Sequence, residues 1–127
     1  MKKIIAGKKI LIVEDEIAVT RLLSERLSKE GFMVSGAKDG AEGLKKAKKT
    51  HPDLIILDII MPVMDGLTML KELRKDKWGR HSQVIILTNL SDGEELATAV
   101  EHKVYDFLVK ADWKLEDLIK KVKEKLK

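Results

Sequence analysis

The sequence predicts a doubly wound α/β fold: a parallel five-stranded sheet, in the order 2-1-3-4-5, with five helices on its two faces. Short apolar runs alternate with segments of helical periodicity along the whole chain. Several runs are apolar without interruption, as expected of parallel strands buried on both faces. The length of 127 residues suits one domain, and we expect residues 1–127 to form it with a core at about 9–126.

The first half of the chain is predicted to run as strand 9–13, helix 17–30, strand 32–37, helix 39–49 and strand 53–57. The first strand ends at an acidic cluster, and Gly31 ends the helix that follows it. Asp39 is a suitable cap for the second helix, and Pro52 ends that helix. The third strand is a buried apolar run that stops at Asp58.

The second half is predicted to run as helix 67–77, strand 83–87, a helix from Ser91 or Asp92 to about 103, strand 104–109 and a final helix from 115 to about 126. A loop with Pro62 and Gly66 leads into the first of these helices. One apolar stripe marks the last helix. The chain ends in that helix, so we expect no output domain and a protein that acts by binding a partner.

The composition excludes several classes of protein. The 25 basic and 21 acidic residues give a net charge of +4. Lysines lie mainly in dispersed clusters without interleaved aromatic residues, which favours solvated helix faces over a nucleic-acid surface. The chain has no Cys, which excludes disulfides and thiol sites and suits the cytoplasm. No run is apolar enough to span a membrane, and the three histidines lack spacing to any partner.

Polar residues follow the strands whose carboxyl ends should meet at one edge of the sheet. Glu14, Asp15 and Asp58 bring three carboxylates together, so the crevice needs a cation. An all-oxygen ligand set with room for water and phosphate favours Mg²⁺. Lys110 and Thr88 add a positive charge and a hydroxyl donor. The arrangement therefore favours an anion that bridges metal and lysine, such as a phosphoryl group.

Four motifs in this order, each at a strand end, resemble the receiver domain of two-component response regulators. They are residues 10–16 (ILIVEDE), 57–66 (LDIIMPVMDG), 87–88 (LT) and 107–110 (FLVK). The resemblance runs from about residue 9 to 126. It implies a signalling switch rather than a turnover enzyme. This switch would accept a phosphoryl group from a sensor histidine kinase or phosphotransfer protein in the presence of Mg²⁺.

The resemblance also implies a role for each matching residue. Asp58 would be the phosphoacceptor and, with Thr88 and Lys110, the catalytic group. The implied metal ligands are Glu14, Asp15, Asp58 and the carbonyl of Ile60, and the implied switch residues are Thr88 and Phe107. The downstream partner is an unknown protein, without direct contact to nucleic acid or membrane, and the chain is expected as a monomer or weak dimer.

Some residues depart from the family pattern. Ala111 stands where receivers commonly have Pro, often after a cis peptide; Asn89 stands where a small residue is common, and Lys103 where Gly is common. Ala111 and Asn89 support an alternative, a pseudo-receiver that binds proteins without being phosphorylated. A third reading, a haloacid-dehalogenase-type phosphatase, lacks its second acid because Ile60 stands two residues after Asp58.

Three further expectations concern orientation around the crevice. Glu16 is expected to point away from it as the next helix begins. Ile60 and Leu90, two residues after Asp58 and Thr88, are expected to hinder the water that would hydrolyse an acyl phosphate. Tyr105, Phe107 and Trp113 are expected to lie on one output surface.

Overall fold

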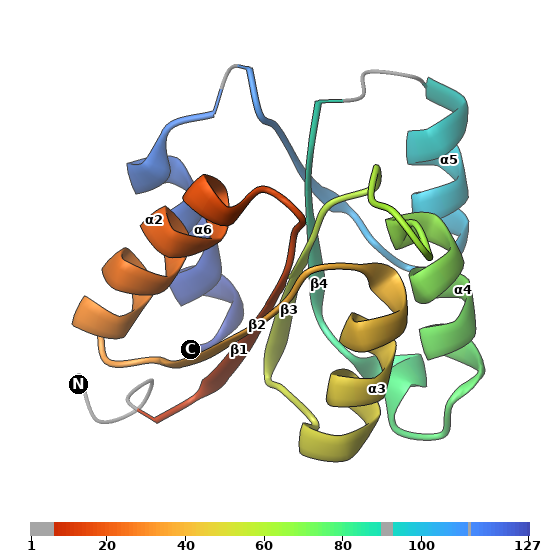
Figure 1. The fold of residues 1–127 in the computed structure, drawn as a ribbon, viewed down its shortest axis with the longest axis horizontal. Coiled ribbons are helices and arrows are strands. Elements are labelled where there is room, and N and C mark those ends of the chain that lie inside the picture. Colours follow the sequence, from red (N-terminus) through yellow and green to blue (C-terminus); the bar gives the residue numbers. More distant parts are fainter. Residues whose placement is uncertain (1–6, 90–92, 112) are drawn as a thin grey trace.

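The computed structural model describes residues 7–89, 93–111 and 113–127. Its middle layer is a parallel sheet in the order β2-β1-β3-β4-β5 (Figure 1). The strands are β1 (Lys9–Val13), β2 (Met33–Ala37), β3 (Leu54–Leu57), β4 (Val84–Thr88) and β5 (Asp106–Val109). The predicted fold class and strand order are confirmed.

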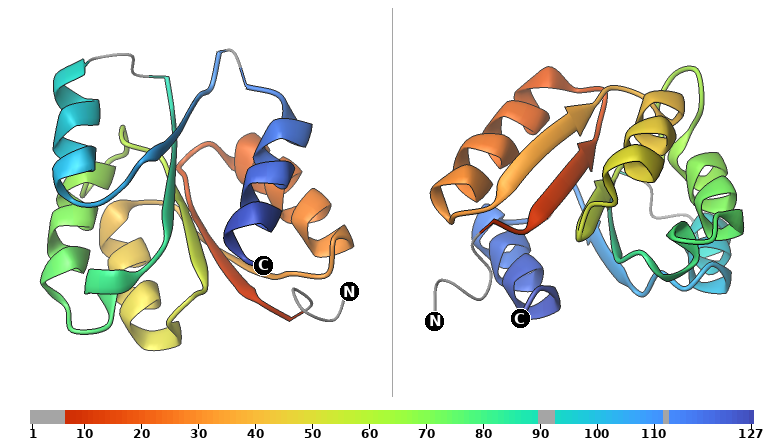
Figure 2. Two further views of the ribbon diagram at one scale, coloured as in Figure 1. Left: turned by 180° about the vertical axis from the view of Figure 1, so that it is seen from behind. Right: turned by 90° about the horizontal axis from the view of Figure 1, so that it is seen from below.

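Helices cover both faces of the sheet. They are α2 (Ile17–Lys29), α3 (Gly40–Thr50), α4 (Gly66–Lys75), α5 (Gly93–Glu101) and α6 (Leu115–Lys125), with a short 3₁₀ helix, η1 (Gly79–His81), before β4. Figures 1 and 2 show α2 and α6 on one face and α3, α4 and α5 on the other. Among the described residues, no helix is both long and apolar enough to cross a bilayer.

The core consists of two apolar layers separated by the sheet. Side chains alternate along β1, so that Leu11 and Val13 join the cluster under α3 and α4, whereas Ile10 and Ile12 join the cluster under α2 and α6. All residues of β3 and β4 are buried. Because both faces of these strands are covered, their sequences are apolar rather than alternating, apart from Thr88 at the end of β4.

Most element boundaries agree with the prediction to within one residue, but α4 and α5 end about two residues earlier than predicted and the fifth strand begins two residues later. Asp39 caps α3, because its side chain accepts a hydrogen bond from the Glu42 N–H at 2.8 Å. The predicted strand start at Val104 is wrong, because the Val104 N–H donates to the Ala99 carbonyl and closes the end of α5. Pairing with β4 therefore begins at Asp106. The predicted helix start at Ser91 or Asp92 lies outside the described residues.

Candidate functional site

The candidate site lies at the carboxyl ends of the central strands, where backbone hydrogen bonds continue beyond the strands. The Asp58 N–H donates to the Val13 carbonyl at 3.0 Å, which holds Asp58 beside Glu14, the residue after Val13. The Lys110 N–H donates to the Thr88 carbonyl at 2.7 Å. The sheet itself thus brings together residues that are far apart in the chain.

Three carboxylates form a compact cluster at this edge. Glu14, Asp15 and Asp58 each present an oxygen, and these oxygens lie within 4.8 Å of one another. Glu14 and Asp58 are 4% and 5% exposed, whereas Asp15 is exposed. Two unit negative charges at about this distance repel by roughly 3 kcal/mol at an effective dielectric constant near 20. The cluster therefore requires positive charge nearby.

Lys110 supplies part of that charge. Its ammonium lies 2.7 Å from Glu14 Oε2, 3.0 Å from Glu16 Oε1 and 3.1 Å from Asp58 Oδ2. An ammonium group has three protons, so three carboxylates use its donor capacity. The side chain is only 8% exposed, which limits screening of these contacts by water. With Asp15 included, four carboxylates face one lysine.

Glu16 lies in the site, and the expectation that it points away is wrong. Its backbone is still extended (φ −82°, ψ 108°) because α2 begins only at Ile17. Alternation in extended backbone places the side chains of Glu14 and Glu16 on the same side. The Glu16 carboxylate consequently reaches Lys110, and the Glu16 N–H donates to Glu14 Oε1 at 3.1 Å. The signal was present in the sequence as two glutamates spaced by two residues.

Burial and charge shift two pKa values in the site. Burial raises the pKa of Glu14 to about 7; Lys110 and the Glu16 N–H oppose that shift, and Asp58 adds to it. Burial alone would lower the pKa of Lys110, but its bonds to Glu14, Glu16 and Asp58 raise it above the usual range. Lys110 is therefore a fixed positive charge, whereas Glu14 takes up a proton easily.

A cavity of about 170 Å³ opens onto the cluster. Its lining residues are Asp15, Glu16, Asp58, Ile60, Asn89 and Lys110. Ile60 is 57% exposed, and Thr88 is buried at the end of β4. Leu90, the other residue expected to hinder water, lies outside the described residues. The described residues contain no cis peptide bond, and Lys110 reaches Asp58 with Ala111 after it.

The loop between β3 and α4 packs closely against Asp58. The Gly66 N–H donates to the Ile59 carbonyl at 2.8 Å, and a Cβ at Gly66 would overlap the Asp58 carbonyl oxygen. Asp65 caps α4 by accepting a hydrogen bond from the Thr68 N–H at 2.8 Å. Met61 is buried in the core cluster under α3 and α4. The glycine therefore allows the helix to start beside the site.

The donor set fits a magnesium ion. The available ligands are carboxylate oxygens, and the chain has no Cys to favour a softer metal. The buried Glu14 Oε2 receives no hydrogen bond in addition to its ion pair with Lys110. The exposed Asp15 leaves one side of the cluster open to water or substrate. Glu14, Asp15 and Asp58 could therefore hold the ion from one side.

Two of the three aromatic residues expected on one output surface lie on opposite faces of the sheet. Phe107 is partly buried against the core cluster under α3, α4 and α5. Trp113 packs against the other cluster, under α2 and α6, so the expectation that it shares a surface with Phe107 is wrong. Tyr105 precedes β5 and is 68% exposed. The chain crosses from one face of the sheet to the other between Phe107 and Trp113.

Comparison with known families identifies the class. The model of the response regulator receiver domain matches residues 10–123, so the chain belongs to this family. Receiver domains are phosphorylation-controlled signalling switches of two-component systems, generally without turnover activity, that bind Mg²⁺ in an acidic pocket. They interact with histidine kinases or phosphotransfer proteins and with downstream effectors.

Individual relatives agree with this assignment. The chain is 41% identical over 103 residues to "Probable transcriptional regulator ycf27" of Porphyridium aerugineum, covering 81% of this chain and 42% of the relative. The structure of the chemotaxis protein CheY4 of Vibrio cholerae matches with a TM-score of 0.87 and 32% identity, over 95% of this chain and 100% of that one. The chain thus spans less than half the length of this curated relative.

A third comparison concerns a complex. CheY of Borrelia burgdorferi, in a CheX–CheY–BeF3–Mg²⁺ complex, matches with a TM-score of 0.84 and 26% identity. The match covers 94% of this chain and 89% of that one.

Proposed function

We propose that this domain accepts a phosphoryl group onto Asp58 from the phosphohistidine of a sensor histidine kinase or phosphotransfer protein, with Mg²⁺ bound by Glu14, Asp15 and Asp58. The observation that carries the proposal is the position of the Lys110 ammonium. It lies 3.1 Å from Asp58 Oδ2 inside the carboxylate cluster. A lysine at this distance can stabilise negative charge on a group attached to that oxygen.

In the proposed reaction, a carboxylate oxygen of Asp58 attacks the phosphorus of phosphohistidine in line. The new O–P bond forms as the P–N bond breaks, and the bonding electron pair leaves with the imidazole nitrogen. Lys110 stabilises charge on the phosphoryl oxygens, and Thr88 is proposed as a hydroxyl donor to them. Bound Mg²⁺ would neutralise further charge on those oxygens, with the Ile60 carbonyl as an additional ligand.

The contacts of Lys110 suggest how phosphorylation is signalled. Before the reaction its ammonium is shared among Glu14, Glu16 and Asp58. A dianionic phosphoryl group on Asp58 competes for the same ammonium, which weakens the contact with the more exposed Glu16. We propose that this exchange, together with Thr88 and Phe107, shifts the population of conformations that bind a downstream protein.

The proposal is tested with acetyl phosphate, a small acyl phosphate, and Mg²⁺, followed by intact mass spectrometry. The expected result is a gain of one phosphoryl group that disappears in the Asp58→Asn variant. Asp117→Asn is the matched control, because it makes the same substitution at an exposed acid of α6. This control should retain the gain, and chelation of Mg²⁺ should abolish it in the unsubstituted protein.

The same experiment distinguishes the pseudo-receiver. A folded protein that gains no mass with acetyl phosphate, and none from a panel of phosphorylated histidine kinases, would refute the transfer reaction and favour a module that only binds proteins. A gain that persists in Asp58→Asn would place the phosphoryl group on another residue. Either result would remove Asp58 from the proposed role.

A further inference from the structure

Two adjoining hollows lie at the edge of the sheet opposite the phosphorylation site, where β4 and β5 begin. Their volumes are about 240 and 200 Å³, and both are lined by Arg74, Arg80 and Lys103. The larger hollow is also lined by His81, Tyr105 and Lys125 among others. We call the two hollows together the basic cleft. Two of the four arginines of the chain meet in it.

Arg74 is held in a fixed position in the basic cleft. Its Nε donates to the His102 carbonyl at 2.7 Å, and its Nη1 donates to the Gly79 carbonyl at 2.6 Å and to Ser82 Oγ at 2.8 Å. These acceptors are all neutral, and no carboxylate of the described residues forms an ion pair with Arg74. Burial lowers the pKa of the group. The charge of Arg74 is thus oriented by the protein but not neutralised by it.

Lys103 has a backbone conformation that disfavours a side chain. Its φ of 64° lies in the left-handed region, where Gly is the favoured residue at a helix end. The lysine side chain is exposed and lacks an ion-pair partner among the described residues. A strained residue of this kind points to a use for the side chain that glycine could not serve. Here the side chain lies at both hollows.

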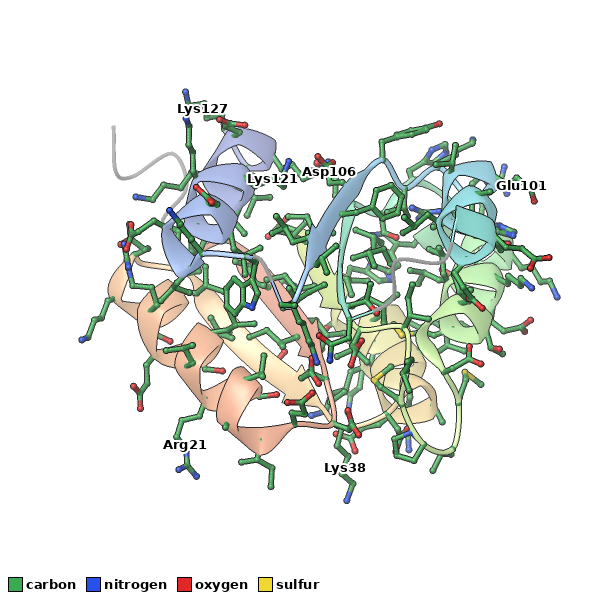
Figure 3. The ribbon with its side chains drawn as sticks, turned by 90° about the horizontal axis from the view of Figure 1, so that it is seen from above. Arg21, Lys38, Glu101, Asp106, Lys121 and Lys127 are labelled. Atoms are coloured by element: carbon green, nitrogen blue, oxygen red, sulfur yellow. The ribbon has the colours of Figure 1, made fainter. Side chains whose placement is uncertain are left out.

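The acids near the basic cleft leave an excess of positive charge. Asp106 is already paired with Lys121 at 3.3 Å and with Lys125 at 2.6 Å. Figure 3 shows Asp106 beside Lys121, and Glu101 on the outer side of α5. Glu101 lines only the smaller hollow. Among the described residues, Glu101 is thus the one acid that lines either hollow, against Arg74, Arg80 and Lys103.

We propose that the basic cleft binds a small soluble ligand that carries a phosphate or diphosphate group. Guanidinium groups form charge-assisted hydrogen bonds with phosphate oxygens. Arg74 is oriented by the protein and its bonds to the protein leave its two Nη2 protons for a ligand, and Arg80 is exposed beside it. The two hollows together fall in the range of roughly 300–1,000 Å³ that is usual for small-ligand sites. The exposed ring of Tyr105 at the larger hollow offers a flat surface for an organic part of the ligand.

This ligand site is separate from the phosphorylation of Asp58 and can be tested without it. The probe is inorganic pyrophosphate, titrated at constant ionic strength in the presence of a chelator, and the readout is backbone amide NMR. Saturable shifts are expected at Gly79, Ser82 and Lys103, with Asp58 and Thr88 unchanged. Removing one charge-assisted contact should weaken the affinity about tenfold, which corresponds to about 1.4 kcal/mol.

Four variants, one of them a control, separate binding from stability. Arg80→Ala and Lys103→Ala should each weaken the affinity by that factor, whereas Lys49→Ala, at an exposed lysine of α3, should leave it unchanged. Lys103→Gly should raise the melting temperature, because the strain is relieved, and weaken binding. If Lys103 served only to end α5, Lys103→Gly would have the higher melting temperature without any loss of affinity. That result would overturn the proposal.

Two further results would also overturn the proposal. One is a set of amide chemical-shift changes that does not saturate as pyrophosphate is added, or that is the same in Lys103→Ala as in the unsubstituted protein. The other is tighter binding of a short polyglutamate peptide than of pyrophosphate at the same amides, because it would indicate an acidic protein segment as the ligand. If the cleft binds pyrophosphate and not the peptide, or binds pyrophosphate more tightly than the peptide, the result supports a small phosphorylated molecule as the ligand.

Discussion

Substituting Lys110 by Met tests the charge balance of the candidate site. The variant keeps an unbranched side chain of similar size and removes an ammonium that lies 2.7 Å from Glu14 Oε2 and 3.1 Å from Asp58 Oδ2. Removing one partner of a buried ion pair destabilises proteins by about 3–5 kcal/mol. We expect the lower end, about 3 kcal/mol in the presence of a chelator, because Glu14 can be protonated and thereby lose its charge.

Magnesium should reduce this loss. A divalent cation held by Glu14, Asp15 and Asp58 would replace the charge that Lys110 supplied, and it should bind more tightly once the ammonium has gone. At about one hundred times its dissociation constant, a ligand stabilises the folded state by about 2.7 kcal/mol. The gain in stability from a fixed concentration of Mg²⁺ should therefore be larger in Lys110→Met than in the unsubstituted protein.

Urea unfolding with and without Mg²⁺ measures both effects. The loss expected in the presence of a chelator corresponds to a fall of about 10 °C in melting temperature for a domain of this size. Lys121→Met is the matched control, because Lys121 pairs with Asp106 but is 33% exposed. It should lose less than about 1 kcal/mol, with or without Mg²⁺. A Lys110→Met variant that loses the same free energy in Mg²⁺ and in chelator would refute the reasoning.

Three further predictions concern single residues near the site. In the presence of a chelator, the free energy of unfolding should fall as pH rises from about 4.5 to 7. The raised pKa of Glu14 means that the folded state binds a proton in this range that the unfolded state has already released. Urea unfolding at a series of pH values should show this slope, and the slope should disappear in Glu14→Gln. Val63→Gly should raise the free energy of unfolding by up to about 1 kcal/mol in urea unfolding, because Val63 has a φ of 66°, whereas Val63→Ala should not. Ile60→Asn should speed loss of the phosphoryl group from Asp58 about tenfold in a decay assay in Mg²⁺, because an amide can hold the attacking water.

Each of these predictions has a result that contradicts it. A pH slope that persists in Glu14→Gln would mean that another group binds the proton. Equal stability of Val63→Gly and Val63→Ala would mean that the left-handed backbone is not strained. Equal decay rates for Ile60→Asn and the unsubstituted protein would show that Ile60 does not control the water.

The fold was predictable because the periodicity of a segment depends on whether one or both of its faces are covered. Strand β3, and strand β4 up to Thr88, are apolar without alternation since helices lie on both sides of them. The position of the site was predictable for a related reason: the carboxyl ends of parallel strands meet at one edge. Glu14, Asp58 and Lys110 each follow a strand directly, and the structure brings them into contact.

The direction of side chains at the junctions between strands and helices was less predictable. Glu16 turns toward Lys110 only because the extended backbone continues for one more residue before α2. Val104 looks like the start of a strand, yet its N–H is used to close α5. In both cases the backbone conformation of one residue determines where its side chain or N–H points, and the pattern of apolar residues does not indicate that conformation.

Contacts between segments that are distant in the chain were decided by the tertiary structure alone. The sequence indicates no partner for His51, but its ring stacks on Trp78 with a centroid distance of 4.5 Å. Arg74 is likewise fixed by the carbonyl of His102, 28 residues away in the chain. The sequence determined which segments form strands and helices and which residues follow the strands, since both depend on local patterns. Only the packed fold decided which side chains share the basic cleft, because that depends on how α4, η1 and the turn after α5 meet in space.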